Sequence, residues 1–108
     1  MAYKRQFYIP NISMWNWQLI SPNYVKLQLE RAQLSYRETD DALRNLETDL
    51  QNINQEILSK WATGSATVMR AFEARYKEVR MENKRIMYVR LKLREVIDRM
   101  NSHLEVLA

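Results

Sequence analysis

The chain has 108 residues, which is enough for one small domain, or for part of a domain whose core a partner completes. Because Cys is absent, disulfides, thiolate nucleophiles and sulfur-ligated metals are excluded, and the single Gly excludes the phosphate-binding loops of Walker and dinucleotide-binding proteins. Hydrophobic residues make up 46% and charged residues 28%, a composition typical of soluble helical proteins, and the formal net charge is +4.

Residues 1–21 are predicted to form an N-terminal arm that is rich in aromatic side chains. Five of the eleven aromatic residues lie there: Tyr3, Phe7, Tyr8, Trp15 and Trp17. Pro10 and the interspersed Asn and Ser residues disfavour a regular helix, so we expect an extended or partly helical arm that packs on another surface. The arm has charges and aromatic rings where a signal peptide needs an apolar core, which predicts a cytoplasmic protein or one secreted without a leader.

Residues 22–108 are predicted to form a helical hairpin, with helices over about 22–62 and about 65–106. Ser21 and Pro22 are typical of a helix start, because Ser accepts hydrogen bonds from the first turn and Pro needs no N–H there. Two helices of similar length joined by a short turn pack antiparallel. The sequence therefore predicts an all-α fold, a long coiled-coil-like hairpin with an aromatic arm.

The connecting turn is predicted at residues 62–65, where the helical pattern is interrupted for the first time. Gly64 is suited to the positive φ of a helix C-terminal cap. Thr63 or Ser65 can then accept hydrogen bonds from the first turn of the second helix. The turn is short enough to place the two helices side by side.

An apolar stripe with alternating spacings of three and four residues runs along each helix. On the first helix it comprises Leu29, Ala32, Tyr36, Thr39, Leu43, Leu46, Leu50, Ile53 and Ile57. On the second helix it comprises Met69, Phe72, Tyr76, Val79, Asn83, Ile86, Arg90, Leu93, Ile97, Met100, Leu104 and Leu107. We expect Asn83 to fix the register of this seam, and Arg90 to snorkel or to pair with Glu30 or Glu38 on the facing helix.

More apolar side chains lie outside these stripes than a two-helix hairpin can bury. Either the arm folds back and covers them, or a second chain, identical or different, completes a three- or four-helix bundle. We therefore expect a protein partner or a homo-oligomer. The candidate partner-binding residues are Phe7, Tyr8, Trp15, Trp17, Leu27, Leu34, Trp61, Met81, Tyr88 and Leu91.

Charge is unevenly distributed along the chain. Residues 1–21 carry a net charge of +2, residues 22–62 carry −2 and residues 63–108 carry +4. Six bases at two adjacent heptad positions form an outward strip: Arg70, Lys77, Lys84, Arg85, Lys92 and Arg99. These candidate anion-binding residues can neutralise the phosphates of nucleic acid or of an acidic membrane surface. The acids interspersed among them favour instead an ordinary solvated face.

No group of residues in the sequence is typical of an enzyme. His103 is the only histidine, and without Cys it begins neither a His-rich metal site nor a Cys–His pair. Asp40 and Asp41 are adjacent, so on a helix they point to different faces and do not make an acid–base pair. We predict a non-enzymatic protein with no cofactor, no metal and no small-molecule substrate.

Trp61 and Gly64 at the turn are followed by an aromatic residue, Phe72, on the second helix. In these residues, in length and in its two antiparallel helices, the chain resembles the WXG-type proteins secreted by type VII systems, which implies a secreted helical hairpin. The motif reads Trp-Ala-Thr-Gly here rather than Trp-x-Gly, and neither Tyr76 nor Tyr88 has an acid four residues later, as the family's export signal does. In size and basic helical character the chain is also similar to the small chaperones of type III secretion, which hold a filament subunit by coiled-coil pairing.

The pattern as a whole predicts a protein-interaction subunit or a chaperone-type protein of a larger assembly, which binds its partner by coiled-coil packing. That assembly is a secretion system, a phage or virus particle, or another multiprotein complex. The alternatives are a basic helical protein that binds nucleic acid or an acidic surface, and a WXG-like secreted hairpin. No apolar run approaches the roughly 18 to 20 residues that a membrane span requires.

Overall fold

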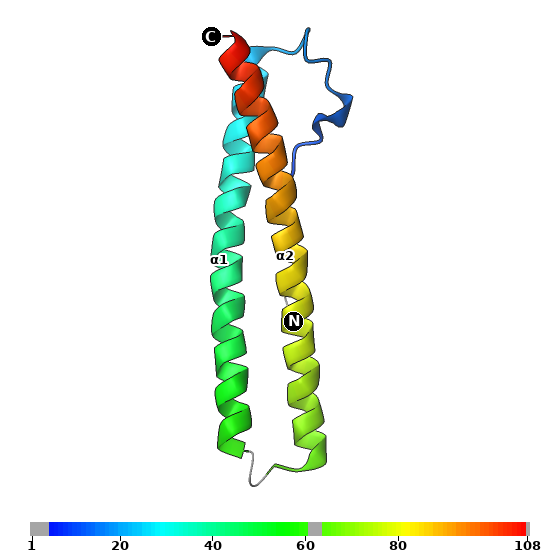
Figure 1. The fold of residues 1–108 in the computed structure, drawn as a ribbon, viewed down its shortest axis with the longest axis vertical. Helices are drawn as coiled ribbons and strands as arrows, with labels where there is room; N and C mark the ends of the chain where they lie inside the picture. The colour runs from blue at the N-terminus through cyan, green and yellow to red at the C-terminus, as the bar shows by residue number, and fades with distance from the viewer. Residues whose placement is uncertain (1–4, 61–63, 108) are drawn as a thin grey trace.

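The computed structural model describes residues 5–60 and 64–107. An arm with one short 3₁₀ turn, η1 (Ile12–Met14), leads into two long helices, α1 (Pro22–Lys60) and α2 (Ala66–Leu107). The helices lie side by side and antiparallel, in a rod of 65 × 20 × 17 Å (Figure 1). The predicted fold class, an all-α helical hairpin, is confirmed. Neither α1 nor α2 contains a segment that is long and apolar enough to cross a membrane.

The ends of the helices follow from local hydrogen bonding. At the start of α1, the Val25 N–H donates to the Ser21 carbonyl at 3.1 Å, and Pro22 occupies the first helical position, where its missing N–H costs nothing. At the start of α2, the Val68 N–H donates to the Ser65 hydroxyl oxygen at 3.3 Å. Ser65 is therefore the N-terminal cap that satisfies one of the unpaired donors of the first turn.

Gly64 does not adopt the positive φ that we expected of it. Its N–H donates to the Lys60 carbonyl oxygen at 2.7 Å, and a Cβ on Gly64 would lie 2.8 Å from that same oxygen. Close approach of the backbone, rather than a left-handed conformation, accounts for glycine at this position. Trp61 and Thr63, which the sequence placed in the turn, lie outside the described residues.

The seam of α2 follows the prediction except at its end, where Leu107, expected in the seam, is 52% exposed. Every seventh residue is buried: Phe72, Val79, Ile86, Leu93 and Met100. On α1 a matching line is buried at Val25, Ala32, Thr39, Leu46 and Ile53. Apart from Phe72 and Thr39, the side chains of the two lines belong to two apolar clusters along the rod.

At three other predicted seam positions of α1, the buried residue is the one that precedes the residue we expected. Gln28, Ser35 and Ala42 are buried, whereas Leu29, Tyr36 and Leu43, which were expected in the seam, are only half-buried. The cause is the arm, which lies on the side of α1 that carries the first set. The Tyr8 hydroxyl, for example, donates a hydrogen bond to the Gln28 side-chain oxygen, which the arm thereby shields from water.

A polar group around Arg90 separates the two apolar clusters. The Arg90 guanidinium is paired with the Asp40 carboxylate, and it donates to the Tyr36 hydroxyl at 2.8 Å and to the Thr39 hydroxyl at 3.2 Å. It also lies over the Tyr36 ring, 4.2 Å from the ring centroid. Arg90 thus pairs with an acid of the facing helix, as expected, but the acid is Asp40 rather than Glu30 or Glu38. Asp40 lies two residues after Glu38 and ten residues after Glu30, so the facing side of α1 and its axial alignment with α2 together select the partner, and Glu38 pairs instead with Arg5 of the arm.

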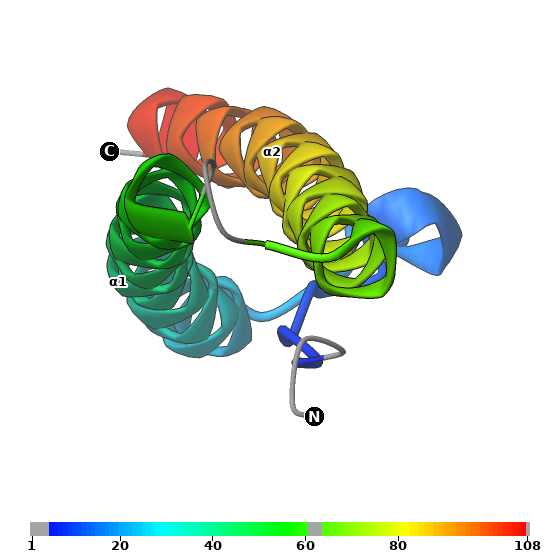
Figure 2. The same cartoon turned by 90° about the horizontal axis from the view of Figure 1, so that it is seen from below.

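The arm folds back along one side of the hairpin. It leaves α1 at the end where α2 terminates and runs toward the middle of the rod (Figures 1 and 2). Pro10 is buried. Phe7 packs on the cluster nearer the turn, and Ile9, Trp15, Trp17 and Ile20 pack on the cluster at the open end. The arm therefore covers part of the apolar surface that two helices alone would leave in water.

Candidate interaction surface

The back of α2 carries exposed apolar side chains. Met81, Tyr88 and Leu91 are 63%, 60% and 55% exposed. Tyr88 lies two residues after the buried Ile86, and two residues correspond to about 200° around a helix, so its side chain points away from α1. The same offset separates Met81 from the buried Val79. We call this line of α2 the outer α2 face, and all of its residues are exposed: Arg70, Ala74, Lys77, Met81, Lys84, Tyr88 and Leu91.

Leu27 and Leu34 are also exposed, but they lie on the back of α1. Each of them follows a buried residue of the seam, Val25 or Ala32, by two positions, so both point away from α2. The two sets of leftover apolar residues, which the sequence grouped together, are therefore on opposite flanks of the hairpin. One partner helix cannot lie on both flanks, and the set on α2 is the larger.

The aromatic residues of the arm make their contacts within the chain. Phe7, Trp15 and Trp17 are half-buried against the hairpin. Tyr8 is partly exposed, and its hydroxyl is bonded to Gln28. In this arrangement the aromatic rings hold the arm on the hairpin, and among them only Tyr8, at 48% exposure, keeps a large part of its surface free. Trp61, the remaining aromatic candidate, lies outside the described residues.

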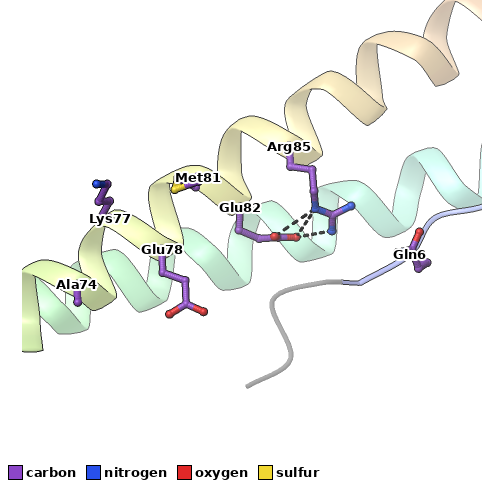
Figure 3. A pocket seen from close by; sticks show the side chains of 7 residues that line it. All are labelled: Gln6, Ala74, Lys77, Glu78, Met81, Glu82 and Arg85. Carbon is purple, nitrogen blue, oxygen red and sulfur yellow. Dashed lines mark hydrogen bonds and ion pairs between the residues drawn. The ribbon is translucent and has the colours of Figure 1, made fainter.

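A pocket of about 580 Å³ lies where the arm meets the outer α2 face (Figure 3). Its lining comprises Gln6, Ala74, Lys77, Glu78, Met81, Glu82 and Arg85. At one edge the Arg85 guanidinium is bonded to the Glu82 carboxylate and donates to the Arg5 carbonyl oxygen at 2.5 Å, which ties the arm to α2. The polar groups at this edge therefore satisfy one another, and the rest of the lining combines Ala74, Met81 and the aliphatic stem of Lys77 with the polar Gln6 and Glu78.

The six bases of the predicted strip divide into two groups. Arg85 holds the arm, Lys92 lies over the Tyr88 ring and pairs with Glu95, and the Arg99 guanidinium lies 4.0 Å from the centroid of the Trp17 ring. The other three bases are Arg70, Lys77 and Lys84. Within residues 5–60 and 64–107 they make no hydrogen bond or ion pair, and they lie on the outer α2 face among the exposed apolar residues.

Sequence reasoning missed several residues that shape this surface. Met87 is exposed beside Leu91, one turn away on the same side of α2. The spacing of three residues between Glu82 and Arg85 is a signal that could have indicated their ion pair, but nothing in the sequence indicates that the Arg5 carbonyl would join it. Since contacts between an irregular arm and a helix have no periodicity, no pattern was available to predict them.

His103 and the acids do not form a reactive site. The His103 ring packs edge-on against Trp17 with centroids 4.9 Å apart, and its Nε2 atom is buried without a hydrogen-bond partner. His103 is thus partly covered by the arm. In the part of the chain that the structure describes, no three side chains of His, Asp or Glu are grouped as metal ligands.

Comparisons of the chain with models of protein families, with curated proteins and with solved structures found no match. The resemblance to WXG-type proteins therefore rests on Trp61, Gly64 and Phe72, on length and on the two antiparallel helices. In the structure Phe72 is a buried residue of the seam near the turn. What this molecule can do has to be inferred from its own surface.

Proposed function

We propose that the chain is a non-enzymatic, helical protein-interaction subunit or chaperone-type protein of a larger assembly, and that it binds a helix of its partner. The observation that carries this proposal is the outer α2 face. Met81, Tyr88 and Leu91 stay more than half exposed after the seam has closed and the arm has folded back. Large apolar side chains that line up on one helix face are typical of surfaces that another protein covers.

The spacing of these residues fits a helical partner in particular. Tyr88 follows Met81 by seven residues, and Leu91 follows Tyr88 by three, which is the spacing of one heptad stripe. A partner helix that packs along this line converts the hairpin into a three-helix bundle. The 42-residue α2 offers such a helix a long surface.

This function is tested by placing a photo-crosslinking phenylalanine analogue at Tyr88 in the cells that make the protein. We expect a discrete crosslinked adduct with one protein, because the partner covers this side chain. The same analogue at Leu58, which is 77% exposed on α1 near the turn, is the control and is expected to give no such adduct. If both positions gave the same products, or if Tyr88 gave none, the outer α2 face would not be a binding surface.

A second candidate function, binding to nucleic acid or to another acidic surface, is favoured by the three unpaired bases Arg70, Lys77 and Lys84. Salt distinguishes the two candidates. Three contacts to phosphates would weaken binding to duplex DNA about 40-fold between about 50 and 200 mM salt. For a protein-interaction subunit we expect DNA binding, measured by fluorescence anisotropy, to be weak even at about 50 mM salt and to show no sequence preference. Tight binding with the steep salt dependence would support the second candidate instead.

A further inference from the structure

We infer that the segment bound by the outer α2 face is an acidic amphipathic helix, an inference that rests on the proposed function and specifies its partner. Along this face, bases alternate with apolar residues at spacings of three and four. Reading from the turn toward the open end, the order is Arg70, Ala74, Lys77, Met81, Lys84, Tyr88 and Leu91, without an acid.

The charge on this line is not neutralised by the chain itself. Two pairs of charged residues on α2 are neutralised within the helix, Glu82 with Arg85 and Lys92 with Glu95. Among the described residues Lys77 and Lys84 make no ion pair, not even with the exposed Glu73 and Glu78 beside this line. A partner helix with carboxylates beside its apolar stripe would place opposite charges at these positions, which favours association and fixes its register.

The pocket beside Met81 gives this helix an anchoring point. It lies on the same line as Ala74 and Lys77 and has room, at about 580 Å³, for a large apolar side chain. The aliphatic stem of Lys77 can cover such a side chain while its ammonium group remains in water. The surface therefore fits best a partner helix that inserts one apolar side chain into this pocket and places a carboxylate on each side of it.

A second copy of the chain fits this face less well. Two outer α2 faces packed together would place bases against bases, which is unfavourable. The back of α1 carries Leu27 and Leu34, but bases lie among its acids there, for example Arg31 beside Glu30. The outer α2 face therefore fits a helix of another protein whose charge is more uniformly negative.

The test uses the full chain and two synthetic helical peptides. Both have Leu at the two apolar heptad positions; the remaining positions are Glu-rich in one peptide and Lys-rich in the other. By fluorescence anisotropy at moderate salt, we expect the chain to bind the Glu-rich peptide about 10-fold more tightly than the Lys-rich one. The double substitution Lys77→Glu and Lys84→Glu should reverse this preference, because it exchanges the sign of the charges beside Met81.

The matched control is the double substitution Lys26→Glu and Arg31→Glu, which changes the net charge by the same amount on α1. It should leave the preference for the Glu-rich peptide in place, and circular dichroism should show both variants to be as helical as the original chain. Equal binding of the two peptides, or a preference that survives the substitutions at Lys77 and Lys84, would overturn the inference.

Two further measurements exclude other occupants. If vesicles of anionic phospholipid bound the chain through Lys77 and Lys84 while the Glu-rich peptide did not, the face would recognise a lipid surface and the inference would be wrong. If light scattering showed a dimer that Met81→Gln disrupts, a second copy would be the occupant. A crosslink from Tyr88 to a partner segment without acids would leave the proposed function in place and overturn only the acidic character.

Discussion

Replacing Leu93 with alanine is expected to lower the free energy of unfolding by about 2–5 kcal/mol. Leu93 is fully buried in the cluster at the open end of the hairpin, where it packs with Val25, Ala32 and Met100. The substitution removes apolar contacts between the two helices and leaves a cavity that closes only if α1 moves toward α2. Denaturation with urea, followed by circular dichroism, measures the change.

Leu91 provides the matched control for this measurement. It is the same residue type, two positions away on the same helix, and it is 55% exposed. Leu91→Ala is expected to change the free energy of unfolding by less than about 0.5 kcal/mol. If Leu91→Ala were the more damaging substitution, the seam would lie on the other side of α2, and the outer α2 face would be the core.

The seam of α2 could be predicted from the sequence because its buried positions are large, apolar and strictly periodic. Every seventh residue from Phe72 to Met100 belongs to it. On α1 the same reasoning selected Leu29 over Gln28, and Tyr36 over Ser35, since apolar residues are normally the buried ones. The structure reverses both choices, because burial there depends on the arm as well as on α2.

The candidate site was predictable in composition but not in arrangement. The exposure of Met81 and Tyr88 followed from their positions outside the heptad stripe. Leu27 lies on the flank of the hairpin opposite to Met81 and Tyr88. This could be seen only once the structure showed which sides of α1 and α2 face each other. The pocket and the contact between Arg5 and Arg85 depend on the path of the arm, which has no periodic signal and is fixed by tertiary contacts.

Trp17→Ala is the second substitution with a large expected effect, about 2–3 kcal/mol of unfolding free energy. Trp17 is half-buried, and its ring contacts Trp15 at 5.1 Å and His103 at 4.9 Å between centroids, with the Arg99 guanidinium over its face. The value is below that of a fully buried tryptophan, because part of the ring already faces water. Urea denaturation measures it, and Leu19→Ala, at an exposed position in the same arm, is expected to have almost no effect.

Trp17→Ala also tests whether the arm and the outer α2 face have separate roles, the arm in covering the core and the face in binding a partner. Once Trp17 is lost, the cluster around Val25 and Met100 is less covered, so we expect stronger binding of a hydrophobic dye and a tendency to self-associate. The crosslink from Tyr88 should persist, because this side chain points away from the seam. If the crosslink disappeared with Trp17→Ala while α2 stayed helical, the partner would contact the arm, and the binding surface would have to include it. A stable variant with unchanged dye binding would instead mean that the arm contributes little to closing the hairpin.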